Sequence, residues 1–261
     1  MENIDVKRPL NRKSRSAGSL GATMDRTSKI NKTRAYHQPG VLPVLQTKEE
    51  TKAFYNKIAK VYDLLAEHSE ELVRQTGLEM LNARSGEKIL EIGFGTGHCL
   101  IELARAVGPL GRVFGIDLSD KMVEISQKRV CEEKLDSRIE LTCGDALHLP
   151  YQSEILDGIF MSFTLELFDT PEIPLVLAEC KRVLKPGGRL VVVGMSRVQP
   201  GGLVMEIFEW THRHFPNYLD CRPILVRQAI EDAGFQIVDS KLTKMWVNVE
   251  IVCGLKVARG H

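Results

Sequence analysis

The sequence predicts an α/β fold with a doubly wound, mostly parallel sheet, and three observations carry that prediction. A short apolar strand at 89–92 runs directly into three glycines at alternate positions, and a helical pattern begins at His98. A second strand-like segment, 112–117, ends in an acid twenty residues beyond the last of these glycines. Further apolar strand segments then alternate with helical ones, as they do in parallel sheets.

The glycine turn is the most informative segment. Gly93, Gly95 and Gly97 can take positive φ and can admit a ligand against bare main chain. A strand, a glycine turn and a helix start together form a nucleotide-binding corner of such a sheet. A dinucleotide fingerprint, G-x-G-x-x-G, would need a third glycine where the chain has His98. The spacing therefore argues against an NAD-dependent oxidoreductase.

Glu91, two residues before the first glycine, completes an E-x-G-x-G-x-G pattern. This pattern resembles the first motif of class I S-adenosylmethionine (SAM) methyltransferases. SAM has no pyrophosphate and carries an ammonium group, so an acid at the strand end suits it. The alternative for Glu91 is a strand-end carboxylate that accepts hydrogen bonds from nearby backbone amides.

Asp117 ends the second strand, where an acid accepts hydrogen bonds from ribose hydroxyls in nucleoside sites. Its neighbour Leu118 is expected to contact the cofactor as well. Asp120 is a rival acid, but its position suggests a first-turn helix residue that the helix dipole favours.

The remaining motifs follow in the order that the resemblance requires. A strand at 138–146 ends in Gly-Asp-Ala, another follows at 156–163, and a Pro-Gly-Gly turn at 186–188 precedes a fifth strand at 189–193. The resemblance covers residues 85–196 and is closest to the ubiquinone/menaquinone-biosynthesis C-methyltransferase group. It implies a cofactor site formed by Glu91, Gly93, Gly95, Thr96, Gly97, Asp117, Leu118, Asp145, Ala146 and Ser162.

The chain departs from that group after the fourth strand. Residues 164–168, Thr-Leu-Glu-Leu-Phe, replace the group's usual glycine- and arginine-containing segment. Because of this departure, a quinone substrate does not follow from the resemblance. The broader assignment to the SAM methyltransferases rests on the other motifs.

Composition is that of one α/β domain with appendages. The chain has 261 residues, a net charge of +1 and no apolar run long enough to span a membrane. This balance argues against specific nucleic-acid binding. Six cysteines without metal-ligand spacing predict reduced, buried thiols in a cytoplasmic protein, and they argue against arsenic methylation. His212 and His214, two residues apart, do not share a helix face, so no metal is expected.

The amino-terminal segment is predicted to be a disordered basic tail, residues 1–46. Residues 1–47 hold nine Lys and Arg against three Asp and Glu, with few large apolar side chains. The tail could contact anionic lipid or nucleic acid, could be passive, or could precede a start at Met24. Glu2 and Asp5 argue against a transit peptide.

Lid helices are expected over 47–84. Thr47 and Glu50 form a capping-box pattern, and apolar residues then recur at helical spacing. Tyr55 and Tyr62 share a face, and the segment resembles the amino-terminal lid of small-molecule methyltransferases. The alternative is that both tyrosines pack against the core with their hydroxyls at its rim.

The region 197–261 is predicted to provide the substrate roof and the last strands, with Trp210 and His214 as pocket candidates. A helix is expected near 224–233, and strands at 236–239 and 246–257 must pair antiparallel because their connection is short. The resemblance implies a Rossmann-like sheet of seven strands with an antiparallel last strand.

The sequence therefore predicts a SAM-dependent methyltransferase whose domain spans 47–261 and whose acceptor is a small hydrophobic molecule, quinone-like or aromatic. Alignment and desolvation would supply most of the catalysis. No catalytic residue is assigned; Glu166, Tyr62 and His214 are candidate bases, with Glu166 alternatively capping the next helix. A non-catalytic SAM-binding module is the competing prediction, and the oligomeric state is open.

A nucleic-acid amino-methyltransferase is disfavoured. Such an enzyme would carry an Asn/Asp/Ser-Pro-Pro-aromatic motif after the fourth strand to hold a flipped base. This chain has Ser-Phe-Thr-Leu at 162–165.

Overall fold

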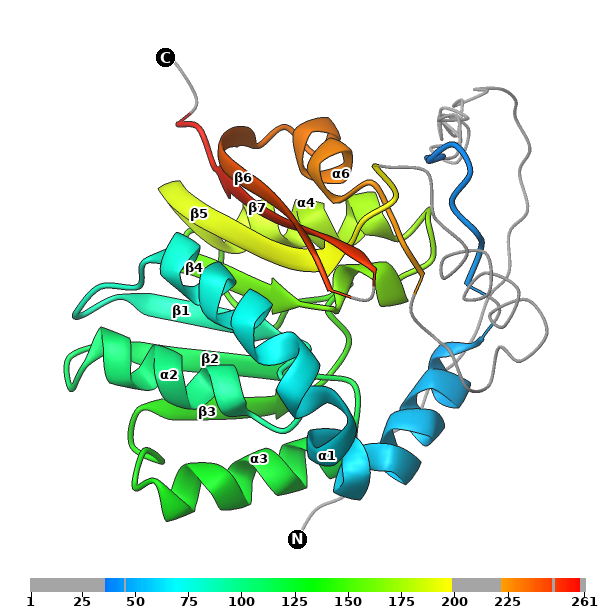
Figure 1. Ribbon diagram of the computed structural model, residues 1–261. Helices are drawn as coiled ribbons and strands as arrows, with labels where there is room; N and C mark the ends of the chain where they lie inside the picture. Colours follow the sequence, from blue (N-terminus) through cyan, green and yellow to red (C-terminus); the bar gives the residue numbers. More distant parts are fainter. Residues whose placement is uncertain (1–35, 45, 199–221, 246, 259–261) are drawn as a thin grey trace, which may run out of the picture. The chain divides into compact units, whose positions relative to one another are not determined.

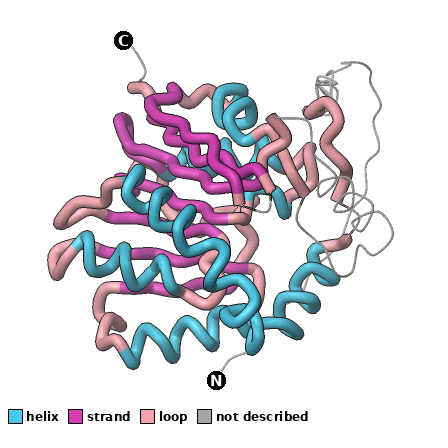
Figure 2. The backbone as a smooth tube through the Cα atoms, viewed as in Figure 1, coloured by secondary structure: helices cyan, strands magenta, loops and turns pink. Residues whose placement is uncertain are grey.

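A seven-stranded sheet with the order β3-β2-β1-β4-β5-β7-β6 organises the fold (Figures 1 and 2). The computed structural model describes residues 36–44, 46–198, 222–245 and 247–258, and for 60–69 the backbone only. The strands are β1 (Lys88–Ile92), β2 (Arg112–Asp117), β3 (Ile139–Cys143), β4 (Leu156–Ser162), β5 (Leu184–Met195), β6 (Gln236–Lys244) and β7 (Asn248–Leu255). The helices are α1 (Lys48–Leu81), α2 (His98–Val107), α3 (Asp120–Glu132), the short η1 (Leu165–Leu167), α4 (Ile173–Val183) and α6 (Val226–Asp232).

Strand β7 is the one reversed strand of the sheet. It pairs antiparallel with both β5 and β6, whereas the pairs among β1 to β5 are parallel. The predicted fold class is thereby confirmed, including the reversal near the end of the chain. Strand β1 lies between β2 and β4, so the strand order changes direction there, and ligands bind beside such a switch point in open α/β sheets.

Helices cover both faces of the sheet because successive strand residues point to opposite sides. Ile89 packs in a cluster with residues of α1, α2 and α3, whereas its neighbour Leu90 packs in a second cluster with residues of α4 and α6. Figure 1 shows the same division, with α2, α3 and the later part of α1 over one face. Two buried layers therefore hold the strand ends in fixed register.

Helix α1 is a single helix of 34 residues rather than several short ones. Its capping box is confirmed: the Thr47 hydroxyl accepts from the Glu50 amide, and the Glu50 carboxylate accepts from the Thr47 amide. The helix ends at Asn82, which takes the left-handed conformation that commonly terminates helices. Its first turns and its last turns are therefore both specified locally.

The ordered chain begins earlier than the sequence predicts. Gln38 is fully buried, and its side-chain amide both donates to the carbonyl of Leu225 and accepts from the Leu225 amide, each at 3.0 Å. These contacts attach residues 36–44 to the start of α6. The predicted tail boundary at residue 46 is corrected accordingly, and the prediction for residues 1–35 lies outside the described residues.

Two further sequence predictions concern cysteines and membranes. The five cysteines in the described ranges are free, but Cys131 and Cys143 are exposed, so the prediction of buried thiols is wrong for these two. None of the helices described here is long and apolar enough to cross a bilayer. Among the described side chains, no group of three or more His, Cys, Asp or Glu is placed to hold a metal ion.

Candidate functional site

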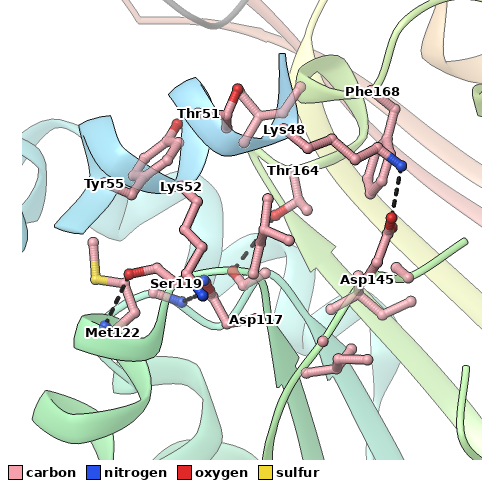
Figure 3. A pocket seen from close by; sticks show the side chains of 18 of the residues that line it. Lys48, Thr51, Lys52, Tyr55, Asp117, Ser119, Met122, Asp145, Thr164 and Phe168 are labelled. Atoms are coloured by element: carbon pink, nitrogen blue, oxygen red, sulfur yellow. Dashed lines mark hydrogen bonds and ion pairs between the residues drawn. The ribbon is translucent and has the colours of Figure 1, made fainter. Parts of the chain in front are cut away.

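A cavity of about 370 Å³ opens at the carboxyl ends of the central strands, beneath the first turns of α1 (Figure 3). This is the switch-point edge of the sheet, and the volume lies within the range of small-molecule sites. Eight residues predicted to form the cofactor or substrate site line it: Tyr55, Gly93, Gly95, Asp117, Leu118, Asp145, Ala146 and Ser162. Segments far apart in the chain therefore meet where the motifs predicted.

Gly93 is required by both conformation and space. Its φ is +71°, and a Cβ built on it would lie 2.3 Å from Oγ1 of Thr164. A side chain at this position would therefore be strained and would displace the start of η1. The bare main chain of Gly93 and Gly95 instead faces the cavity.

Asp117 is held by backbone amides while its oxygens retain acceptor capacity. Its Oδ2 accepts from the Gly95 amide at 2.9 Å, and its Oδ1 accepts from the Ser119 amide at 2.8 Å. A carboxylate has about four lone-pair sites on its two oxygens, so the group retains capacity to accept a hydrogen bond from a ligand. Burial raises the pKa of Asp117 to about 6, and at neutral pH most of this carboxyl is ionised. The group is suited to a pair of ligand hydroxyls.

Two lysines of α1 extend from the helix toward the strand ends (Figure 3). The Lys48 ammonium lies 2.6 Å from Oδ2 of Asp145 and 3.1 Å from Oε1 of Glu172. Lys52 forms an ion pair with Asp120 at 2.9 Å. These contacts hold the start of α1 over the cavity.

Several lining residues were not predicted from the sequence. Lys48, Thr51 and Lys52 lie on the cavity side of α1 with Tyr55. Their spacing of three, four and seven residues is that of one helix face, so a polar stripe was the available signal. Phe168 and Glu172, from the segment after η1, also line the cavity, and no sequence pattern marked them.

The end of β4 has a strained backbone and a buried hydroxyl that has no hydrogen-bond partner among the described residues. Phe163 has a φ of 49°, which is costly for a bulky residue and typical of functional sites. The Oγ of Ser162 is buried and has no hydrogen-bond partner among the described residues. Both residues line the cavity, so this hydroxyl is available to a ligand.

Three predicted cofactor residues lie outside the lining. Glu91 is buried, and burial raises its pKa well above the ordinary value, with Arg74 opposing this shift. Thr96 is buried behind the turn. Gly97 precedes α2 with a φ of +85°, and a Cβ there would approach Ser126 Oγ to 2.8 Å. Their direct contact with the cofactor stays a prediction.

The other substrate candidates divide into two groups. Glu166 is fully buried but does not line the cavity. Tyr62 lies in α1 among the residues whose side chains are not described, and Trp210 and His214 lie outside the described residues.

The lining suits SAM. Asp117 offers acceptors for two hydroxyls, the main chain at Gly93 and Gly95 allows close approach, and Ser162 provides an unfilled hydroxyl. Asp145 and Ala146 also line the cavity, and the resemblance assigns these two positions to the adenine. The donors and acceptors of the lining thus match a nucleoside with an amino-acid end.

Comparison with known proteins identifies the same family as the sequence motifs. Residues 44–220 match the model of the ubiE/COQ5 methyltransferase family. A demethylmenaquinone methyltransferase of Lactobacillus johnsonii is 32% identical over 63% of this chain and 68% of its own length. The corresponding protein of Halalkalibacterium halodurans is 34% identical over 58% of this chain and 63% of its own length. The family resemblance inferred from the motifs is confirmed.

Solved structures support the fold. A crystal structure of the cyclase SpnF covers 83% of this chain and 98% of its own, with a TM-score of 0.67 and 18% identity. A geranyl diphosphate C-methyltransferase from Streptomyces coelicolor, in complex with S-adenosyl-L-homocysteine, covers 83% of this chain and 100% of its own. Its TM-score is 0.65 and its identity 16%, so both likenesses concern the fold alone.

Proposed function

The chain belongs to the ubiE/COQ5 methyltransferase family and is a SAM-dependent methyltransferase, and on that premise we propose that it methylates a ring carbon of a quinone-like acceptor in its reduced form. The observation that carries the proposal is the convergence of the glycine turn, Asp117 and Asp145 on one cavity within the matched region. The curated relatives are named for demethylmenaquinone methylation, which supports a bicyclic quinone-like ring.

The lining residues would contact different parts of the cofactor and of the acceptor. Asp117 would bind the ribose hydroxyls, Asp145 and Ala146 would adjoin the adenine, and Ser162 would hold the amino-acid end or the acceptor. Phe163, Leu167 and Phe168 provide an apolar wall beside them, which suits a flat ring. When bound, SAM supplies an activated methyl group, so the residues of the chain mainly align the acceptor and exclude water.

The first half of α1 would act as the lid over both ligands. Lys48 and Lys52 anchor it through ion pairs to Asp145 in the loop after β3 and to Asp120 in the first turn of α3. The pairs are partly exposed, so each contributes little to stability and can be exchanged when ligands enter. A non-catalytic SAM-binding module is the less favoured function, because the curated relatives are named as enzymes.

Calorimetric titration tests the cofactor site. We expect SAM to bind in the micromolar range and NAD not to bind. Asp117→Ala should weaken SAM binding by about tenfold to a hundredfold, since two charge-assisted hydrogen bonds are lost. Asp136→Ala is the control, because Asp136 is an exposed acid that does not line the cavity. Equal losses in both variants would contradict the assignment of Asp117.

Turnover tests the acceptor. The full chain is mixed with SAM and 1,4-dihydroxynaphthalene under anaerobic, reducing conditions, and release of S-adenosylhomocysteine is measured together with the mass of the product. A product heavier by one methyl group on carbon supports the proposal. Binding of SAM without any methylated product would instead favour a non-catalytic module or a different acceptor.

A further inference from the structure

Residues 36–44 form a strap that leads along the fold to the cavity. The match of the family model begins at residue 44, so residues 36–43 precede it. The strap contains no helix or strand and runs as a blue loop in Figure 1. Tyr36 and Val41 pack against the buried cluster that includes residues of α4 and α6. The strap is therefore held by contacts with the rest of the fold and not by secondary structure of its own.

A tight turn in the strap is set by its sequence. The Val41 amide donates to the Gln38 carbonyl at 3.2 Å, which closes a four-residue turn over Pro39 and Gly40. Gly40 has a φ of +74°. Proline at the second position and a glycine of positive φ at the third are typical of a type II turn. The Arg197 side chain packs against this turn, since a Cβ built on Gly40 would lie 3.0 Å from its Nε. The strap therefore changes direction at a fixed place beside the segment that follows β5.

Gln38 fixes the strap to the residue before α6. Gln38 is fully buried; its Nε2 donates to the Leu225 carbonyl and its Oε1 accepts from the Leu225 amide, each at 3.0 Å. Nε2 also donates to the Tyr36 hydroxyl at 3.2 Å. Ile224, next to Leu225, forms a β-bridge with Ser196 directly after β5. A side-chain amide both donates and accepts, whereas a carboxylate only accepts, so this pair of bonds to one backbone residue is specific to an amide side chain.

The other end of the strap reaches the cavity. Val44 lines the cavity, and the Val44 amide donates to Oδ1 of Asp169 at 3.2 Å. The same oxygen accepts from the Thr170 amide at 2.9 Å. Asp169 and its neighbour Phe168 also line the cavity. One carboxylate therefore holds the backbone of Val44 against the segment after η1, which provides the apolar wall.

The strap comes to the cavity from the side of β4 and β5. The glycine turn and Asp145, which mark the cofactor half, follow β1 and β3, whereas β4 and β5 lie on the other side of β1. The two anchors of the strap, Asp169 and Leu225, follow β4 and β5 in the chain. Helix α1 reaches the cofactor half only afterwards, where Lys48 pairs with Asp145. Val44 is therefore placed to contact the acceptor rather than the nucleoside.

We propose that Val44 is a specificity-determining residue for the acceptor ring, and that Gln38 is the positioning residue that holds Val44 in place through the strap. This inference rests on the proposed function. Valine is branched at Cβ and has few side-chain rotamers, so on a fixed backbone it gives the wall a constant shape. A ring substituent beside this wall fits or clashes according to the size of the side chain at position 44. In an apolar site one methylene changes relative affinity by about tenfold or more.

Binding of stable bicyclic probes tests Val44 without turnover. The full chain is saturated with S-adenosylhomocysteine, and calorimetry measures the Kd of 1,4-dimethoxynaphthalene and of its 2-propyl and 6-propyl derivatives. Val44→Ala should favour one propyl derivative over the unsubstituted probe by about tenfold relative to the native chain, because the removed methyl groups leave space for it. Val44→Leu should shift the same ratio in the opposite direction. Val41→Ala is the matched control, since Val41 is a valine of the same strap that does not line the cavity, and it should leave the ratio unchanged.

A double-mutant cycle separates positioning by Gln38 from a purely structural role. Gln38→Ala removes both hydrogen bonds to Leu225, and Gln38→Glu keeps the size but loses the bond to the Leu225 carbonyl. In either background, Val44→Ala should change the probe ratio by less than about threefold, because the strap no longer holds the side chain at the wall. A purely structural role of Gln38 would lower the thermal unfolding temperature but leave the tenfold effect intact. SAM affinity should change by less than about threefold in every variant, which also verifies that each one is folded.

Four outcomes would overturn the inference: a probe ratio unchanged in Val44→Ala for both propyl derivatives, an equal change in Val41→Ala, a full Val44→Ala effect in the Gln38 variants, or a tenfold loss of SAM affinity in Val44→Ala. The last result would place Val44 in the cofactor half. Failure of the proposed function alone looks different, because the probes then bind and respond to Val44 as described, but 1,4-dihydroxynaphthalene is not methylated. Absence of any probe binding by the native chain would contradict both.

Discussion

Two buried regions of the fold differ in how their polar groups are satisfied. At the cofactor end, both oxygens of Asp117 accept from backbone amides that belong to the glycine turn and to the loop before α3. Behind η1 and outside the cavity lining, Glu166 and Arg222 are fully buried, and each leaves side-chain atoms without partners among the described residues. The first region is organised by local backbone, and the second by side chains from distant segments.

The difference reflects whether the hydrogen bonds of a buried group come from nearby backbone or from distant side chains. A glycine turn and a strand-end acid form their own hydrogen bonds within a few residues, so any sequence with the motif builds the same corner. Buried charges without full pairing are costly, so a substitution at such a group changes the free energy of unfolding. Three predictions test this contrast, and they are given in decreasing order of expected effect.

Gly93→Ala should have the largest effect, at the cofactor end. The left-handed backbone costs about 1–2 kcal/mol for alanine, and overlap with Thr164 adds about 1–3 kcal/mol. Urea unfolding should show a loss of about 2–5 kcal/mol, together with weaker SAM binding. Gly86→Ala is the matched control, since its φ is +85° but nothing lies within 4 Å of the added Cβ. Similar losses in the two variants would show that the contact with Thr164 is unimportant.

Glu166→Gln should act on stability in the opposite direction, and only at high pH. The carboxyl has a pKa of about 7 in the folded chain against an ordinary 4.5, so the folded state holds its proton more tightly. Its stability contribution is complete below about pH 4.5 and is lost as pH rises through 7. The variant should therefore be more stable than the native chain by up to about 3 kcal/mol at pH 8, and equal at pH 4.5.

The free energy of unfolding of both proteins across this pH range checks the sign. A native chain whose stability rises with pH relative to the variant would contradict the raised pKa.

Thr47→Ala should have the smallest effect. It removes the capping hydrogen bond to the Glu50 amide and should cost about 1 kcal/mol, localised to the first turn of α1 over the cofactor. Hydrogen exchange of amides 48–52 should accelerate while the sheet is unchanged. Thr76→Ala in the same helix is the control: Thr76 lies mid-helix, where alanine is the better helix former, so no loss is expected. A loss of stability in both variants would show that the effect comes from removing a threonine hydroxyl and not from removing the helix cap.

Most of the fold could be predicted from the sequence because its signals are local. The glycine turn at 93–97, the acid at 117 and the reversed strand 248–255 each follow from spacing, turn chemistry or connection length. The same locality explains the cofactor residues that the structure brings to the cavity. Glu91 shows the limit of such reasoning, because a motif position does not say which way a strand side chain points. It lies outside the lining, buried near Arg74.

The sequence by itself determined the sheet, the nucleoside corner and the class of methyl donor, because those features depend on backbone conformations set within a few residues. Only the tertiary structure decided that Lys48 meets Asp145 and Glu172, and that Arg222 bonds to Phe168. These pairings join residues that are far apart in the chain. They form where helix ends and loops from separate parts of the chain meet, and a periodic pattern within one segment does not identify its partner in another.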